Sequence, residues 1–217
     1  MKKLSRQHVI LMTVLFLVPT SVLAEMGDGE LIAAAGSGNS SRLKSLLSTG
    51  ADVNARGEEG ATALIAAARN GYEEIVEILV EAGADIAAKT ANGTTALMRA
   101  SQGGHRKIVQ QLLAARADPN AGRDDGVTVL MQAAQEGQKE IVQLLLAAGA
   151  KADARLDNGA TALMLAVQIG HAGVARALIA GGADVNSKAG NGATALMLAS
   201  KYRHQDLVGI LKEAGAR

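Results

Sequence analysis

GATALIAAARNGYEEIVEILVEAGADIAAKTAN, residues 60–92, decides the fold, because its pattern returns every 33 residues to the end of the chain. Its first glycine recurs at that spacing, as do the threonine two residues later and the leucine two residues after that. The three columns are Gly60, Gly93, Gly126, Gly159 and Gly192; Thr62, Thr95, Thr128, Thr161 and Thr194; and Leu64, Leu97, Leu130, Leu163 and Leu196. Identity at a fixed period over five cycles indicates a repeat array.

One period contains two predicted helices. Thr62 can cap the first, because its hydroxyl can accept a hydrogen bond from a free backbone N–H of the first turn. The alanine-rich residues 63–70 form that helix, and Gly71 reverses the chain. Acidic residues from Glu73 suit the start of a second helix, which ends at Gly83. Its expected buried residues, at helical spacing, are Ile75, Val76, Leu79 and Val80.

A single unit of this kind cannot cover its own apolar face, so neighbouring units must stack. Residues 84–92 lack helical periodicity and predict a hairpin-like loop between one unit and the next. The expected fold is therefore all-α: a solenoid of stacked helix-turn-helix units joined by hairpin loops.

The pattern resembles the ankyrin repeat family, and the resemblance covers about residues 31–217. The family's Thr-Pro-Leu-His opening appears as TALI at 62–65, TALM at 95–98, TVLM at 128–131, and TALM at 161–164 and 194–197. Its Gly-Ala-Asp-x-Asn exit appears as GADVN at 50–54 and 182–186. Alanine or valine replaces the family's proline, and isoleucine or methionine replaces its histidine, so the hydrogen bonds of that histidine are lost. The chain looks most like small exported bacterial ankyrin proteins.

The resemblance implies six units, and the residues before them are expected to be a signal peptide. The expected boundaries are 1–24 for the signal peptide, 25–59 for an N-terminal capping partial repeat, 60–92, 93–125, 126–158 and 159–191 for four full repeats, and 192–217 for a C-terminal capping repeat.

The first 24 residues have the pattern of a secretory signal. A basic segment without acids precedes the apolar run 9–18, and small residues at Val22 and Ala24 favour cleavage between Ala24 and Glu25. Ten apolar residues rise about 15 Å as a helix, about half of a bilayer core, which argues against a membrane anchor. We therefore expect a periplasmic or secreted protein without stable membrane insertion after cleavage. A cytoplasmic or membrane-anchored regulator requires that Ala24 is not cleaved.

The composition excludes several classes of function. The chain has no cysteine and only three aromatic residues, which excludes thiol catalysis, iron–sulfur clusters and base-stacking platforms. Its formal charge of +1 becomes about −2 without the three cations of the signal segment, so nucleic acid is not an expected partner. No catalytic motif or phosphate-binding loop occurs. We expect neither an enzyme nor a cofactor.

Two columns could in principle bind metal. Met98, Met131, Met164 and Met197 could form a copper(I) or redox-sensitive ladder, but gap-filling between thin alanine-rich helices is the favoured interpretation. His105, His171 and His204 share the corner after the first helix, where successive layers stand about 8–10 Å apart, too far for shared ligation. We expect no metal site.

The family's binding surface consists of the hairpin tips and the neighbouring face of the first helices. In this chain that surface is charged and polar in the early units, whereas apolar and basic residues gather in the later ones. The predicted protein-binding residues are Val127, Arg155, Leu156, Gln168, Ile169, Lys188, Lys201 and Tyr202. Interfaces draw their energy from a few apolar or aromatic anchors ringed by polar groups, which favours Ile169 and Tyr202 as anchors. For the basic residues a solvated column is the alternative, and for Tyr202 it is a cap over the last layer.

We therefore expect a monomeric, exported interaction module that binds or supports a periplasmic or extracellular protein. A secreted effector that acts on host proteins is the alternative.

Arg116 stands where other units end their second helix with glycine. This position predicts a left-handed backbone, which arginine disfavours.

Overall fold

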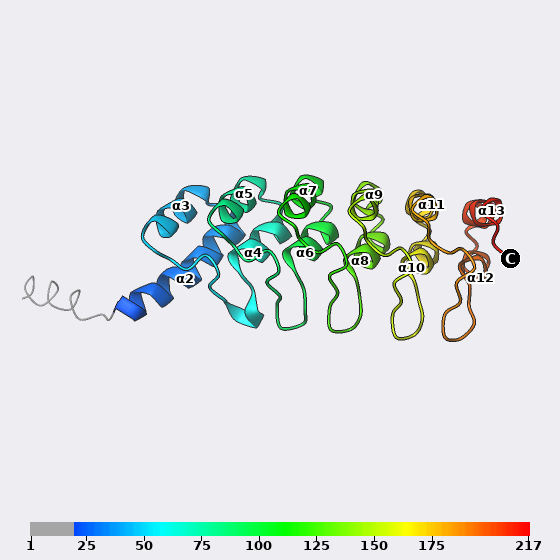
Figure 1. The fold of residues 1–217 in the computed structure, drawn as a ribbon, viewed down its shortest axis with the longest axis horizontal. Coiled ribbons are helices and arrows are strands. Elements are labelled where there is room, and N and C mark those ends of the chain that lie inside the picture. The colour runs from blue at the N-terminus through cyan, green and yellow to red at the C-terminus, as the bar shows by residue number, and fades with distance from the viewer. Residues whose placement is uncertain (1–19) are drawn as a thin grey trace, which may run out of the picture.

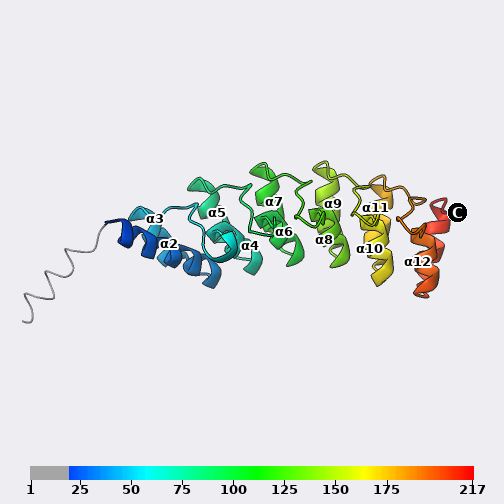
Figure 2. The same ribbon diagram turned by 90° about the horizontal axis from the view of Figure 1, so that it is seen from below.

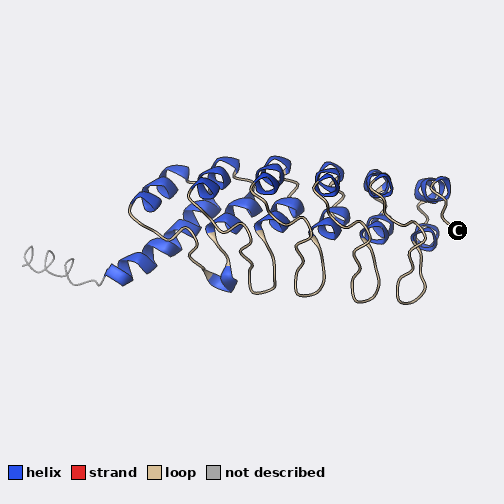
Figure 3. Cartoon of the chain, in the orientation of Figure 1, coloured by secondary structure: helices blue, strands red, loops and turns tan. Residues whose placement is uncertain are grey.

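The computed structural model describes residues 20–217, with side chains described from residue 28. These residues form twelve α-helices in two parallel rows, with loops projecting beyond the lower row (Figure 1). Figure 2 shows the same succession of units from below, and Figure 3 shows that the described chain is helix and loop. The predicted all-α solenoid of six units is confirmed.

The lower row contains the first helix of each unit: α2 (Thr20–Ser37), α4 (Ala63–Asn70), α6 (Ala96–Gln102), α8 (Val129–Gln135), α10 (Ala162–Ile169) and α12 (Ala195–Lys201). The upper row contains the second helices: α3 (Ser40–Ser48), α5 (Glu73–Glu81), α7 (Arg106–Ala114), α9 (Lys139–Ala147), α11 (Ala172–Ala180) and α13 (Gln205–Glu213). A 3₁₀ turn, η1 (Glu58–Gly60), lies in the hairpin before α4, and one isolated bridge joins Gly122 and Thr128.

The threonine column begins the first helices as predicted. Thr62 accepts a hydrogen bond from the backbone N–H of Ile65 at 3.4 Å, and the four later threonines accept one from the methionine three residues on. Each bond satisfies one of the free donors of a helix N-terminus, so the same cap begins every unit from α4 to α12.

The core is a continuous line of aliphatic side chains between the two rows of helices. In the unit of residues 60–92, Ile75, Val76 and Leu79 are buried as predicted, whereas Val80 is only half-buried. Val80 lies at the edge of the helical stripe, where the neighbouring layer covers only part of its side chain.

The corner after each first helix shows how layers fit together. Gly71 has φ 81°, and a Cβ there would lie 2.6 Å from the ring of His105 in the next unit. The ring Nε2 of His105 lies 3.1 Å from the carbonyl oxygen of Arg69, and His171 and His204 make the equivalent contacts. The histidine column thus joins consecutive layers.

The last corner differs, because Arg203 replaces glycine at φ 62° and no layer of the described chain packs on it.

Exposed ion pairs also join consecutive helices of the upper row. The Lys44 ammonium, for example, lies 2.9 Å from the carboxylate of Glu74. The hydrogen bond from Lys44, with a second one from Ser40, holds the pKa of Glu74 below its usual value.

The predicted signal segment lies mostly outside the described residues, since residues 1–19 are not described. The proposed cleavage bond, Ala24–Glu25, lies within α2. Among the helices described, none combines the length and the apolar character needed to cross a bilayer.

Candidate functional site

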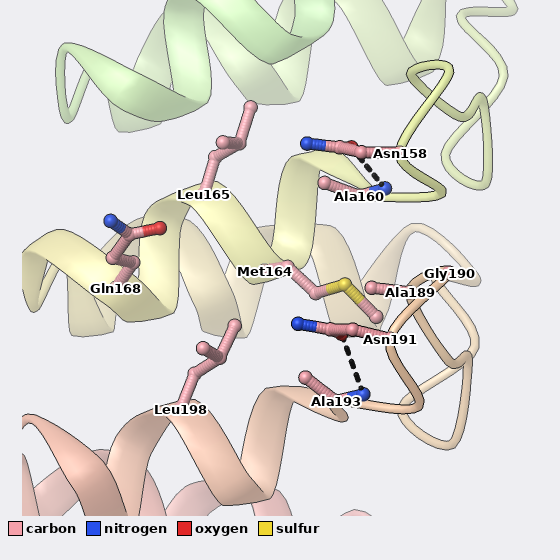
Figure 4. A pocket seen from close by; sticks show the side chains of 10 residues that line it. All are labelled: Asn158, Ala160, Met164, Leu165, Gln168, Ala189, Gly190, Asn191, Ala193 and Leu198. Atoms are coloured by element: carbon pink, nitrogen blue, oxygen red, sulfur yellow. Dashed lines mark hydrogen bonds between the residues drawn. The ribbon is translucent and has the colours of Figure 1, made fainter.

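The first helices and the hairpin tips enclose a groove where the fifth and sixth units meet (Figure 4). Its volume is about 470 Å³. The floor and walls come from α10, α12 and the hairpins before them: Asn158, Ala160, Met164, Leu165, Gln168, Ala189, Gly190, Asn191, Ala193 and Leu198. Alanine and glycine line the hairpin side, and the two leucines line the helix side, where both point in the same direction along the stack, toward the preceding unit (Figure 4).

Two carboxamides form the hairpin side of this groove. The side-chain oxygens of Asn158 and Asn191 each accept a hydrogen bond from the backbone two residues on, at Ala160 and Ala193, both at 3.0 Å. These bonds fix the side chains, so each amino group is directed toward the groove (Figure 4). Donors held in place in this way lose little conformational entropy when a partner's carbonyl group binds.

The hairpins that carry these asparagines are also joined directly. The backbone N–H of Gly190 donates to the carbonyl oxygen of Asn158 at 2.7 Å, and a Cβ at Gly159 would lie 2.8 Å from that nitrogen. Glycine at both positions therefore permits the close approach that keeps the two asparagines in adjacent layers.

Large apolar side chains are exposed on the two helices that line the groove. Ile169, Met197 and Tyr202 are 48%, 58% and 41% exposed, and they are the exposed large hydrophobic residues among those described. All three belong to α10, α12 or the residue that ends α12. The Lys201 ammonium lies 5.4 Å from the centre of the Tyr202 ring, and the His204 ring is stacked at 6.4 Å.

The repeat positions that line the groove carry different side chains in the earlier units. Arg99 on α6 occupies the repeat position of Leu165 and Leu198, and Arg123 occupies that of Ala189. Burial lowers the pKa of Arg99, the positive charges of Arg69 and Arg123 lower it further, and Glu59 acts in the opposite direction. The Arg99 guanidinium nevertheless stays charged, because arginine does not lose its proton in proteins.

A sequence profile described as "Ankyrin repeats (3 copies)" matches residues 31–123 and 130–217, most of the chain. The chain belongs to the ankyrin repeat family. An ankyrin array is a non-catalytic scaffold for protein–protein interaction, and this holds for the present chain. No curated protein matches the chain in sequence.

Of the predicted binding residues, Gln168 lines the groove, whereas Ile169, Lys201 and Tyr202 are exposed beside it at the ends of α10 and α12. Val127 and Leu156 are half-buried in the hairpins, where they pack against the ankyrin core. Their role in binding stays a prediction, with less surface to offer than expected.

Arg155 lies in a different environment from the one expected of a free basic residue. Its guanidinium donates to the carbonyl oxygen of Lys188 at 2.8 Å and to the Ser187 hydroxyl at 3.1 Å, so it joins one ankyrin hairpin to the next. Arg56 makes the same contact with the carbonyl oxygen of Lys89. Lys188 itself is exposed, and among the described residues no further hairpin follows it.

The methionine column contains three buried members and one exposed member in the last unit. Met98, Met131 and Met164 are at most 2% exposed and belong to the core, so the packing interpretation is confirmed for them. Met197 is exposed because no ankyrin layer of the described chain covers it. Within residues 20–217, no three His, Asp or Glu side chains converge on a possible metal position.

The apolar floor of the groove was not predicted from the sequence. Leu165 and Leu198 lie in a column that holds Ala66, Arg99 and Gln132 in the earlier units. That change from small or polar residues to leucine was a usable signal, and so was the asparagine pair two residues before Ala160 and Ala193.

Proposed function

We propose that this chain is an exported, non-catalytic ankyrin scaffold that binds an extended segment of a periplasmic or extracellular protein. The observation that carries the proposal is the groove between the fifth and sixth units, with Ile169 and Tyr202 exposed at the ends of the two helices that line it. Apolar anchors next to fixed polar donors have the composition of an energetically important interface patch.

An extended segment suits this site better than a folded surface. The leucines of α10 and α12 repeat along one side of the groove, and the asparagine amino groups face it from the hairpin side (Figure 4). Amide donors along a groove pair with the backbone carbonyl groups of an extended chain, while the floor accepts its side chains.

Substitution of the anchors tests the binding face. Ile169→Glu and Tyr202→Ala should each weaken binding of the captured partner by at least about 1 kcal/mol, the usual threshold for an interface residue. Urea midpoints should barely change, because both side chains are exposed. If the midpoints fall and the amount of partner bound per folded molecule is unchanged, Tyr202 is a cap and the binding face lies elsewhere.

Export is supported by the signal pattern of residues 1–24. N-terminal sequencing of the protein from its native host should give Glu25 as the first residue. A cytoplasmic pool that begins at Met1 would overturn the proposed localisation and leave the binding face unaffected.

A further inference from the structure

Three arginines lie near one another in the early units, since the charges of Arg69 and Arg123 both act on Arg99. Arg69 is on α4, Arg99 is on α6, and Arg123 lies in the hairpin before α8. Their repeat positions are those of Gln168, Leu198 and Ala189, each of which lines the groove between the last two units. Because the units share one backbone pattern, the three arginines face the same side of the stack.

These guanidinium groups have few partners among the described residues. Arg99 donates to the Gln102 side-chain oxygen at 3.2 Å, and Arg123 pairs with Asp125 at 2.5 Å. The buried Nε of Arg123 has no hydrogen-bond acceptor, and no described carboxylate forms an ion pair with Arg69 or Arg99. Each guanidinium has five N–H donors, so most of the donors in this cluster are free.

The fold itself does not require arginine here. The position of Arg99 holds Gln132 in the next unit and Leu165 in the one after, and both fit the same helix. Placing like charges together at partly buried positions opposes folding, and an unpaired buried donor adds to that cost. A bound carboxylate would offset the positive charge and accept hydrogen bonds from the unpaired donors, because its two oxygens match the planar guanidinium fork.

We propose that Arg99, flanked by Arg69 and Arg123, binds a side-chain carboxylate of the protein segment that occupies the groove. This inference rests on the proposed function and specifies its partner. Three layers separate Arg99 from Leu198, about 24–30 Å at the usual helix spacing. An extended chain covers that distance in about eight residues. The partner segment is therefore acidic at one end and apolar about eight residues away.

Fluorescence anisotropy with a labelled hexaglutamate peptide tests the carboxylate site on the purified protein, with labelled hexaglutamine as the uncharged comparison. We expect the protein to bind hexaglutamate and not hexaglutamine, and Arg99→Gln to weaken binding at least tenfold. Arg106→Gln is the matched control, because Arg106 is exposed at the start of α7 in the same unit and its loss changes the net charge equally. It should leave the affinity unchanged.

Three results would overturn the inference: no binding by the unsubstituted protein, an equal loss in both variants, or displacement of the peptide by an equimolar amount of inorganic phosphate, which would assign the site to phosphate groups. Misfolding is separated by the thermal midpoint, which Arg99→Gln should leave unchanged or raise. A captured partner that is lost with Ile169→Glu and retained with Arg99→Gln would overturn this inference while the proposed function stands.

Discussion

The early and late units share one backbone pattern and differ in the side chains at the repeat positions that line the groove. Between the last two units Leu165 and Ala189 give an apolar floor, whereas in the middle of the stack the same repeat positions hold Arg99 and Arg123. The threonine caps and the helix bounds are nearly identical in both halves. The difference shows that this array keeps its packing columns constant and varies the side chains that face the groove.

Packing of the next layer restricts which residue each packing column can hold. Interior corners need glycine because a Cβ would meet the following unit's corner side chain, but Arg203 tolerates a left-handed backbone where no described layer follows. The same reason explains why Met164 is buried and Met197 is exposed.

The largest expected effect comes from a substitution that the corner conformation shared by the interior units cannot accommodate. A Cβ at Gly137 would lie 2.8 Å from the His171 ring, and φ there is 74°. Gly137→Ala should therefore lower the free energy of unfolding by about 2–4 kcal/mol, from backbone strain and overpacking together. Arg203→Ala, at the same repeat position in the last unit, should change it by less than about 0.5 kcal/mol. Urea unfolding measures both, and equal losses would mean that the next layer does not set the corner.

A second substitution tests whether the early half of the stack is packed less well than the late half. Ser101 on α6 is fully buried and its hydroxyl has no hydrogen-bond partner, whereas Ala68 and Ala134 occupy the same column. Ser101→Ala should raise the free energy of unfolding by about 1 kcal/mol, because an unsatisfied buried hydroxyl costs about 1–3 kcal/mol.

The control for this substitution is Ser200→Ala, in the same column of the last unit. The Ser200 hydroxyl is exposed and donates to the carbonyl oxygen of Leu196 at 2.9 Å, so little change is expected. A loss of stability in Ser101→Ala would show that the hydroxyl has a partner, such as water.

The smallest expected effect concerns the exit turn between the two halves. Arg116 has φ 66°, which confirms the left-handed backbone expected from the sequence. Arg116→Gly should raise the free energy of unfolding by less than about 1 kcal/mol, because glycine relieves that strain and also gains entropy in the unfolded chain. The reverse change, Gly149→Ala at φ 91°, should lower it by about 1 kcal/mol, since no atom lies near the added Cβ. A destabilised Arg116→Gly variant would mean that the arginine makes a contact that outweighs the strain.

The fold could be predicted from the sequence because the packing columns repeat with a fixed period. Residues 63–70 form a helix with the predicted bounds, and Thr62 caps it. The site could be predicted only in part. Gln168 was found from the repeat register, but the leucine floor was not, because the period says which residues share a column and not which columns border an open space.

Arg155 shows that contacts between layers could not be predicted from the sequence. In the sequence it is one basic residue among several, and only the structure shows that its guanidinium is held by the next hairpin. The same holds for Arg99: its chemistry depends on Arg69 and Arg123, which are 30 and 24 residues away in the chain. Contacts of this kind depend on the distance between layers, which a local pattern does not give.

Site-specific photo-crosslinking in the native host tests most directly whether the groove is the binding face. The photoreactive residue p-benzoylphenylalanine is placed at Leu198 in the groove and, as the matched control, at Arg176, which is exposed on α11 in the opposite row of helices. The account predicts a discrete crosslinked protein from position 198 that is lost when Ile169→Glu is added, and none from position 176. An adduct that forms from position 176 and not from position 198 would contradict it.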